Sequence, residues 1–156
     1  MTGCYCGSGA CYALCCQPYH HSLQTAQTPE ILMRSRYAAY ASANIDYIKT
    51  TMTGQASDGF DPVSATLWSQ RVLWISLHVI RSEMIAATHG TVEFIACFVD
   101  GKSVQYMHEL SEFRFIEGHW YYVDGVSLSS EKEYTITRNM LCPCKSQKKW
   151  KHCHGR

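Results

Sequence analysis

The chain has 156 residues, of which 46% are hydrophobic and 17% are charged, a composition typical of one soluble globular domain with small appendages. No stretch approaches the roughly 18 uninterrupted apolar residues that a membrane-spanning helix needs, so no membrane partner is expected. The start, MTGCYCGSG, lacks the basic and apolar segments of a secretion signal. We therefore expect a cytoplasmic protein whose thiols are reduced.

A net charge of +1 conceals an uneven distribution of charged side chains. Residues 1–29 carry none, residues 30–130 carry seven Lys or Arg against eleven Asp or Glu, and residues 131–156 carry seven against two. The last segment is therefore opposite in sign to the middle of the chain. Such a shift in composition predicts a separate basic module at the C-terminal end.

Five of the nine cysteines lie within CYCGSGACYALCC, residues 4–16, ahead of every charged residue. The spacing C-x-C-x8-C-[CH] in this stretch recurs 138 residues later in the chain. A closed set of four sulfur or nitrogen ligands is typical of a structural, tetrahedral zinc site, so two Zn²⁺ ions are predicted. The predicted ligands are Cys4, Cys6, Cys15 and Cys16 in the first copy, and Cys142, Cys144, Cys153 and His154 in the second.

Three other uses of these cysteines are less favoured. An odd number of cysteines and a reducing compartment disfavour a disulfide cluster, which would also leave the histidine of the second copy without a role. An iron–sulfur cluster suits the four cysteines of the first copy better than the mixed second set. A thiol redox pair usually shows C-x-x-C, which is absent from this sequence.

The middle of the chain begins with helical patterns. Thr28-Pro29-Glu30 is a helix start, and apolar residues at helical spacing from Met33 to Met52 predict one long helix. Asp61-Pro62 starts a second, short helix that reaches about Gln70. Within the two metal modules, Ser8 and Ser146 are predicted to cap short helices at their N-termini.

From Leu73 onward the hydrophobic period changes to two, which is typical of strands. Four strands are predicted, over residues 73–80, 92–98, 103–116 and 119–123, separated by Gly-containing turns such as Asp100-Gly101. Helices followed by an antiparallel meander predict an α+β domain, in which a cone-like curved antiparallel sheet packs on the N-terminal helices.

The last stretch, LCPCKSQKKWKHCHG, resembles the SEC-C motif, a short zinc module found at the end of the SecA translocation ATPase, where it docks on partners. The usual form is C-P-C-G-S-G-K-K-[YF]-K-x-C-[CH], and Lys145 and Gln147 replace its two glycines here. The first copy keeps Gly7, Ser8 and Gly9 but lacks the lysine pair. The resemblance therefore implies two zinc modules, of which only the second has the charge for electrostatic docking.

The order of elements resembles the nuclear transport factor 2-like, or cystatin-like, fold, a cone of sheet around an N-terminal helix. MRSRYAAY (33–40), DYIKT (46–50) and FRFIEGHWYYVDG (113–125) resemble the bacterial YchJ family, which carries this domain between two SEC-C motifs. The resemblance implies three units, at 1–20, 28–128 and 139–156. It implies no particular activity, and Thr53 stands where the family generally has a histidine.

Cones of this fold often hold a ligand in the open end. The polar residues that could line a pocket here are Arg34, Arg36, His78, His108, Glu112 and Arg114, with Glu109 and Asp124 as further candidates. These charges could equally pair with one another and fix the helix on the sheet. No Ser-His-Asp, paired-carboxylate or phosphate-loop pattern is present, so no catalytic residue is assigned and enzymatic activity stays undecided.

The basic run at the C-terminal end predicts a docking surface. Its residues are Lys145, Lys148, Lys149, Trp150, Lys151 and Arg156, and together they could attract an acidic protein or a nucleic acid. A protein partner is the first expectation. The predicted function is a zinc-binding adaptor that docks an acidic macromolecule through this module, and the alternative is a small-molecule binder or enzyme that uses the cone.

Overall fold

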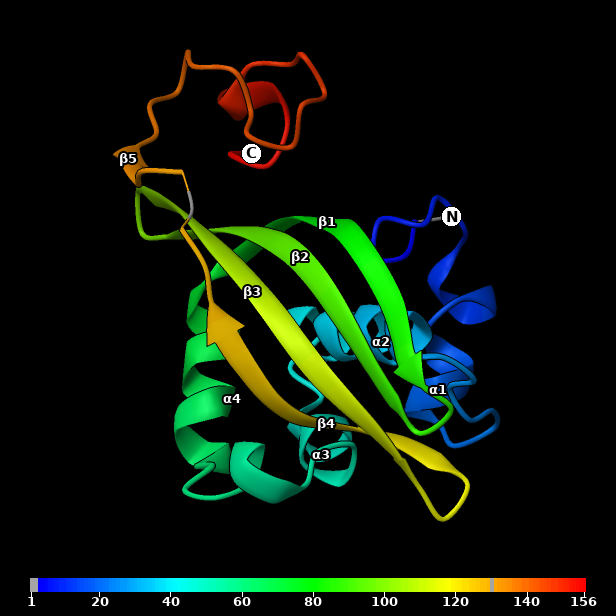
Figure 1. The fold of residues 1–156 in the computed structure, drawn as a ribbon. Coiled ribbons are helices and arrows are strands. Elements are labelled where there is room, and N and C mark those ends of the chain that lie inside the picture. Colours follow the sequence, from blue (N-terminus) through cyan, green and yellow to red (C-terminus); the bar gives the residue numbers. More distant parts are fainter. Residues whose placement is uncertain (1–2, 130) are drawn as a thin grey trace.

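The computed structural model describes residues 3–129 and 131–156 and shows an α+β fold (Figure 1). Four long strands form an antiparallel sheet in the order β1-β2-β3-β4, and a short strand β5 pairs with β3. The strands are β1 (Leu73–Ala86), β2 (His89–Asp100), β3 (Ser103–Ile116), β4 (His119–Ser127) and β5 (Tyr134–Thr135). The helices are α1 (Gln17–His20), α2 (Pro29–Ala41), α3 (Ile45–Thr50) and α4 (Pro62–Arg71). None of the described helices is long and apolar enough to cross a membrane.

The predicted start of α2 is confirmed, but the single long helix is wrong. The Thr28 side chain accepts a hydrogen bond from the Ile31 amide at 3.2 Å, and Pro29 follows it as the first helical residue. The helix ends at Ala41, because Ala43 adopts a left-handed backbone with φ 55°. Asn44, the one polar residue on the predicted apolar stripe, instead caps the separate helix α3.

The predicted meander is confirmed, and the expected boundaries of β3 agree with the structure at both ends. Strands β1 and β2 extend beyond the predicted ranges, because their hairpin continues in pairs such as Met84 with Gly90 and Ala86 with His89. The two-residue strand β5 was not predicted, since a segment so short has no measurable period.

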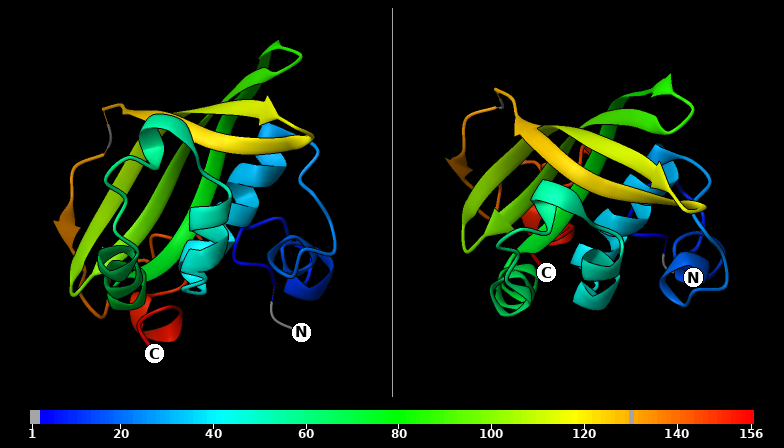
Figure 2. Two further views of the ribbon diagram at one scale, coloured as in Figure 1. Left: turned by 90° about the horizontal axis from the view of Figure 1, so that it is seen from below. Right: turned by 60° about the horizontal axis from the view of Figure 1, so that its bottom comes forward.

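The main hydrophobic core lies between α2 and the concave face of the sheet (Figure 2). Leu32 and Tyr37 of α2 pack there with Val92, Phe94 and Phe113 from the strands. A second cluster, which includes Ala39 and Ile48, joins α2 to α3. Both clusters meet on α2, so the buried area of this one helix holds the sheet and the other helices together.

The N-terminal module, residues 3–20, packs on α2. Its buried cysteines Cys4, Cys6 and Cys16 contact Ala38, which is fully buried. His20 adds a polar link: its Nε2 lies 2.7 Å from the Ser35 carbonyl and its Nδ1 lies 2.8 Å from the Tyr12 hydroxyl. A carbonyl can only accept, so Nε2 carries the proton and Nδ1 accepts from Tyr12.

His20 is half-buried in helix α1, whereas its neighbour His21 is exposed. A two-residue polar pattern cannot show this, because both hydrogen-bond partners of the ring lie elsewhere in the sequence.

The C-terminal module, residues 139–156, packs on the convex face of the sheet. Trp150 and Cys144 contact a cluster on that face that consists of Ile75, Cys97, Val99, Val104 and Ile136. Cys97 is 3% exposed and packs there as a small buried apolar residue. Figure 1 shows the two modules apart from each other, with the N-terminal module beside α1 and α2 and the C-terminal module beyond β5.

The geometry of His20 predicts a pH dependence of stability. Burial lowers the pKa of His20, so the folded state disfavours the proton that the unfolded chain accepts near pH 6.5. Its contribution to the free energy of unfolding is therefore complete above about pH 6.5 and is lost as the pH falls through the folded pKa.

We expect His20→Gln to lower the free energy of unfolding by about 1–2 kcal/mol at pH 7, because two hydrogen bonds are lost. Urea denaturation of metal-loaded protein at pH 7 and pH 5 should show this difference shrinking towards pH 5. The cysteine ligands are the same in both chains, so their protonation cancels in the comparison. A difference that widens at pH 5 would contradict the assignment of a neutral His20.

Candidate metal centres and the inner cavity

The four cysteines of the N-terminal module surround one point. The sulfur atoms of Cys4, Cys6, Cys15 and Cys16 all lie within 4.8 Å of one another. The Sγ–Sγ distance is 3.6 Å between Cys6 and Cys15 and 3.9 Å between Cys15 and Cys16. A tetrahedron with metal–sulfur bonds of about 2.3 Å has edges of about 3.8 Å, so this spacing fits a bound Zn²⁺. A disulfide, with sulfur atoms about 2.05 Å apart, does not fit.

The C-terminal module gathers Cys142, Cys144, Cys153 and His154 in the same way, again with ligand atoms within 4.8 Å. The Sγ atoms of Cys144 and Cys153 are 3.6 Å apart, and Nδ1 of His154 lies 3.2 Å from Cys142 and 3.3 Å from Cys153. Burial lowers the pKa of His154, which favours the neutral imidazole that a metal requires. All nine cysteines of the chain are free thiols.

The two modules share their backbone as well as their ligands. The first ligand donates its amide hydrogen to the residue six positions later in both copies, at 2.7 Å for Cys4 and 2.8 Å for Cys142. The third ligand closes a single turn of 3₁₀ helix in both, through bonds of 3.1 Å from Cys15 and 3.0 Å from Cys153. These bonds recur at the sequence offset of 138 residues.

A serine accompanies the third ligand in each module. Ser8 Oγ lies 3.2 Å from Cys15 Sγ, and Ser146 Oγ lies 3.4 Å from Cys153 Sγ. Neither 3₁₀ turn has a side-chain cap. The expectation that these serines are N-caps is therefore corrected: each hydroxyl hydrogen-bonds a candidate ligand and accepts from the amide two residues on.

The second cysteine of each set has a lowered pKa, whereas burial raises the pKa of the first, Cys4 and Cys142, to about 11. A hydrogen bond with Cys16 lowers the pKa of Cys6 to about 4, with a further contribution from Ser8. In the other module, burial raises the pKa of Cys144, but hydrogen bonds from Ser146 and from neighbouring thiols outweigh burial and lower it. Both sites therefore favour a thiolate, the form of cysteine that binds metal.

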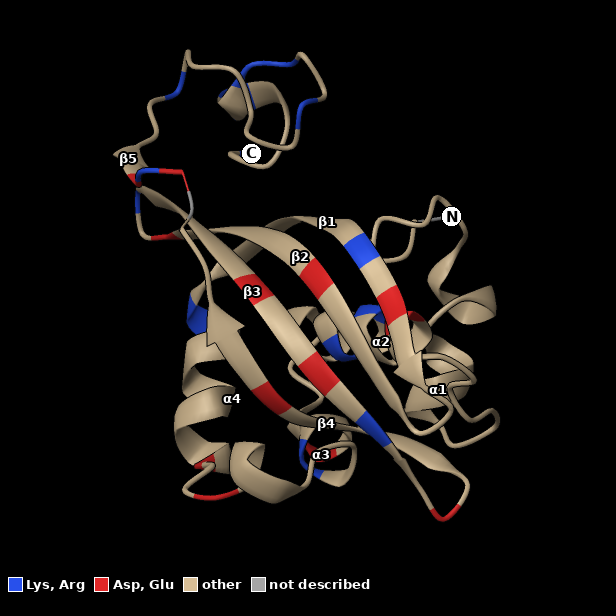
Figure 3. Cartoon of the chain, in the orientation of Figure 1, with Lys and Arg blue, Asp and Glu red and all other residues tan. Residues whose placement is uncertain are grey.

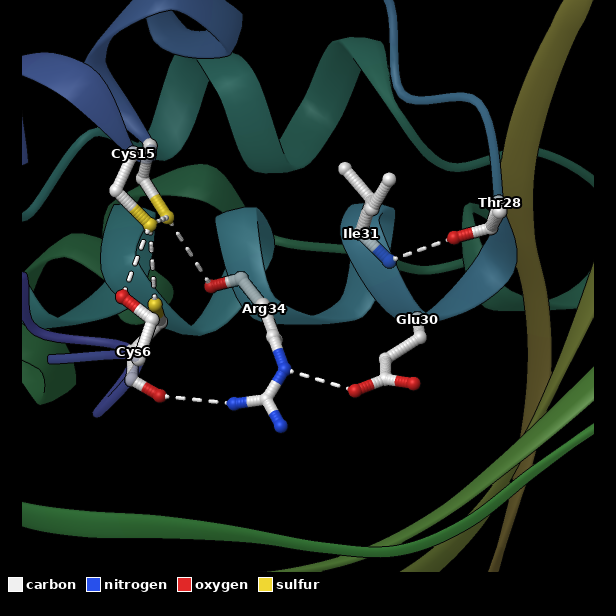
Figure 4. Close-up of polar contacts among 8 residues, drawn as sticks. Cys6, Cys15, Thr28, Glu30, Ile31 and Arg34 are labelled. Carbon is white, nitrogen blue, oxygen red and sulfur yellow. Dashed lines mark hydrogen bonds and ion pairs between the residues drawn. The ribbon is translucent and has the colours of Figure 1, made fainter. Parts of the chain in front are cut away.

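Arg34 belongs to the surroundings of the N-terminal cysteine set, not to a pocket. Its Nη1 donates to the Cys6 carbonyl at 3.1 Å and its Nε donates to Glu30 at 3.0 Å (Figure 4). Its own carbonyl accepts from the Cys16 thiol at 3.9 Å. These contacts tie the backbone at Cys6 and the Cys16 side chain to helix α2. The expectation that Arg34 lines a pocket is therefore corrected.

Around the C-terminal set, the charges face solvent while the tryptophan does not. Lys145, Lys148 and Lys149 are exposed, and Lys151 is half-buried. Trp150 packs on the convex face of the sheet, and a Cβ atom at Gly155 would overlap its indole ring. The expectation of an exposed Trp150 beside the lysines is thus corrected, because the ring anchors the module to the domain.

A cavity of about 180 Å³ lies between α2, α4 and the concave face of the sheet. Most of its wall is aromatic, from Tyr37, Tyr40, Trp68, Trp74, Phe113 and Tyr122. Two charged side chains, Arg36 and Glu109, also line it. Tyr122 and Ser111 both donate to the Glu109 carboxylate, each at 2.8 Å.

Of the six predicted pocket residues, Arg36 alone lines this cavity. The register pairs His78 and His108 with Ile95, and Glu112 with Asp124, on the convex face of the sheet.

The convex-face residues pair with each other: His108 lies 2.8 Å from Glu93, and Arg114 lies 2.7 Å from Glu112. Their expected place in a pocket is therefore corrected. Glu109 lines the cavity instead. The alternation along β3 places Glu109 on the same face as Phe113, and this pattern is the sequence signal for its position.

Two family models match the chain. "YchJ, middle NTF2-like domain" matches residues 28–125, and "SEC-C motif" matches residues 138–156. Among curated relatives, a UPF0225 protein of Serratia proteamaculans is 40% identical, over 98% of this chain and 97% of its own. A UPF0225 protein of Photorhabdus laumondii is 42% identical, over 97% of this chain and 98% of its own.

Solved structures agree. The solution structure of a SEC-C motif containing protein from Rhodopseudomonas palustris is 40% identical and gives a TM-score of 0.75, over 82% of this chain and all of that one. A crystal structure of a SEC-C motif containing protein from Psychrobacter arcticus is 32% identical, with a TM-score of 0.69 over 96% of this chain and 88% of that one. The chain therefore belongs to the UPF0225 family, with the NTF2-like middle domain of YchJ followed by a C-terminal SEC-C motif.

Proposed function

We propose that this protein is a zinc-stabilised adaptor that docks an acidic protein partner through its C-terminal SEC-C module. The observation that carries the proposal is the difference between two copies of one metal module. The N-terminal copy has no charged residue and is packed on α2, whereas residues 142–156 carry five Lys or Arg and no acid. The need to hold the same four ligands explains why the two copies share a backbone conformation. Recognition of a partner explains why only the C-terminal copy carries charge.

The donor sets support zinc in both modules. Four sulfur atoms, or three sulfur atoms and one imidazole nitrogen, form the closed tetrahedral sets that structural zinc prefers. Zinc bound here would supply the energy that orders modules too short to have a core of their own. A cytoplasmic location, where thiols stay reduced, is part of this proposal.

The N-terminal module is, in this proposal, a second SEC-C motif that has lost its docking charge. It has the ligand spacing and the backbone hydrogen bonds of the C-terminal module. Gly7 and Gly9 have positive φ angles of 75° and 83°, as do Lys145 and Gln147 at 61° and 62° in the equivalent positions. This agreement in backbone conformation supports a common motif where the sequence has diverged.

The backbone at Lys145 also supports a docking role. A left-handed conformation at a non-glycine residue costs about 1–2 kcal/mol, and the N-terminal copy avoids this cost with Gly7. The C-terminal copy keeps an exposed lysine there instead. Such strain is a feature of functional positions and agrees with selection for charge on this surface.

The charge distribution favours an acidic partner that reaches the module from solvent. Figure 3 shows Lys and Arg along the C-terminal module, whereas the strands of the sheet carry mostly Asp and Glu. Within the described part of the chain, no ion pair includes Lys145, Lys148, Lys149 or Lys151. These ammonium groups are therefore free to pair with a partner.

We expect two zinc ions per chain by elemental analysis of protein purified without added metal. Cys6→Ser and Cys144→Ser should each lose one ion, because three remaining ligands no longer close the site. Cys6→Ser should lower the melting temperature more, since the N-terminal module is packed on α2, which holds the core. A protein that is free of metal, with titratable thiols and both modules folded, would contradict the proposal.

Reversing Lys148, Lys149 and Lys151 to Glu should abolish salt-sensitive binding of the partner, because the exposed charges no longer attract an acidic surface. Capture of the partner from lysate with and without nuclease treatment, each at low and high salt, measures this binding. Reversal of Lys49, Lys102 and Lys132 is the matched control, since it changes the net charge equally at exposed sites outside the module. Binding that is lost equally in the control would show that only net charge matters, and binding that disappears with nuclease would point to a nucleic acid.

Lys145→Gly separates the two roles of that position. Glycine adopts φ of 61° without strain, so the C-terminal module should become more stable by about 1 kcal/mol. Partner binding should weaken at the same time, because one exposed charge is removed. Zinc release by a chelator, followed with a colorimetric zinc dye, should be slower than in the native chain. Faster release, or binding stronger than that of the native chain, would count against the role given to Lys145.

A further inference from the structure

The inner cavity has the size of a small ring compound. Its volume is about 180 Å³, and a protein cavity of about 150 Å³ accommodates benzene. It lies on the concave side of the sheet, whereas the C-terminal module packs on the convex side. A ligand in this cavity would therefore be independent of docking through the module.

The walls favour an aromatic occupant. Trp68 and Trp74 are edge-to-face with ring centroids 5.1 Å apart, and Tyr37 and Trp74 are edge-to-face at 5.3 Å. Flat apolar faces and edges from several directions hold a planar ring by stacking and edge contacts. The sulfur atoms of Met33 and Met107 add polarizable contacts to the same wall.

Two opposite charges line the cavity without pairing. Arg36 is 6% exposed, and no ion pair of the described residues includes Arg36 or Glu109. The Arg36 guanidinium lies 4.8 Å from the centroid of the Tyr122 ring, whose hydroxyl donates to Glu109. The formal charges cancel, so an occupant with a net charge would leave one buried charge uncompensated.

Arg36 and Glu109 both keep hydrogen-bonding atoms that no described residue uses. Only Nη1 of Arg36 is occupied by described residues, through the Ile48 carbonyl at 2.8 Å and the Thr51 hydroxyl at 2.7 Å. Both bonds to Glu109 go to Oε1, which leaves Oε2 as an acceptor. The described hydrogen bonds therefore leave Arg36 as a donor and Glu109 as an acceptor at the cavity wall.

Gly125 leaves space for the Glu109 carboxylate at the wall of the cavity. A Cβ atom at Gly125 would overlap the Glu109 carboxylate and the Tyr122 hydroxyl. Glycine at this position of β4 therefore allows both groups to sit where they do, at the wall of the cavity.

We propose that the cavity binds a neutral, monocyclic aromatic compound whose polar substituent accepts a hydrogen bond from Arg36 and donates one to Glu109, as a primary carboxamide does. The ring occupies the aromatic walls, and the substituent bridges the two charges that do not reach each other. Neutrality follows from the balance of Arg36 and Glu109.

Three probes of one shape test the proposal on the full-length, metal-loaded protein: benzamide, benzoate and protonated benzylamine. The indole N–H signals of the four tryptophans in ¹⁵N NMR are the readout, since Trp68 and Trp74 line the cavity and Trp120 and Trp150 do not. Benzamide should shift the signals of Trp68 and Trp74 saturably, with a Kd on the order of 1 mM for so small a ligand. Benzoate and benzylammonium should bind at least about tenfold more weakly, because each brings an unbalanced charge.

Three variants test whether the probes bind in the cavity. Glu109→Gln keeps acceptors for Tyr122 and Ser111 but leaves Arg36 unbalanced, so the preference should move from benzamide to benzoate. Glu112→Gln, on the convex face of the same strand, is the matched control and should leave the preference unchanged. Ala96→Leu fills part of the cavity and should weaken all three probes, with the Trp120 and Trp150 signals reporting that the fold is intact.

The proposal is overturned if benzamide gives no saturable shift of Trp68 and Trp74, or if the native chain binds benzoate or benzylammonium as tightly. Should Glu109→Gln fail to fold, the comparison of the three probes on the native chain decides alone. An unchanged preference in folded Glu109→Gln would also overturn it.

Discussion

Burial of helix α2 against the concave face of the sheet is the interaction on which the rest of this structure depends. One side of the helix gives Leu32 and Tyr37 to the core, and Ala38 contacts the N-terminal cysteines. Polar groups of the helix make further links: the Ser35 carbonyl accepts from His20, and the Arg36 guanidinium donates to the Ile48 carbonyl in α3. A helix of 13 residues thus positions the first metal module, the second core cluster and one charged wall of the cavity.

The two metal modules show how surroundings can divide the roles of one motif. Both have the same ligand spacing, and both place a serine beside the third ligand. The N-terminal module is held by packing and by Arg34, so little of its surface is free to recognise a partner. Trp150 packs on the convex face of the sheet and anchors the C-terminal module, whereas Lys145, Lys148 and Lys149 are exposed. The same backbone hydrogen bonds therefore carry exposed charge in one module and none in the other.

The cavity follows from the mismatch between a curved sheet and a straight helix. Where α2 leaves the concave face, aromatic side chains from α4 and the strands fill most of the space, and the remainder is lined by Arg36 and Glu109. Buried charges of this kind contribute little to stability compared with apolar residues of the same volume. Here the Arg36 guanidinium donates to the Ile48 carbonyl and the Thr51 hydroxyl, and the Glu109 carboxylate accepts from Tyr122 and Ser111, so both buried groups are hydrogen-bonded within the fold.

The sequence by itself determined several features that depend on local spacing. The eight candidate metal ligands, the caps of α2 and α4, and the ends of β3 all follow from residues within one turn or one strand, where backbone geometry fixes which side chains meet. The repeat at an offset of 138 residues needed no structure either.

Only the tertiary structure decided which face of each element is covered. Alternation along β3 separates Glu109 from His108 and Glu112, but which set faces the helices depends on contacts far apart in the sequence. The same holds for Trp150, whose partners Ile75 and Val104 belong to other strands. The break between α2 and α3 was equally hidden, because the apolar spacing continues across Ala43, whose left-handed backbone interrupts the helix. The hydrophobic period of a segment shows which residues share a face of a helix or strand. Only long-range packing decides which of the two faces is buried.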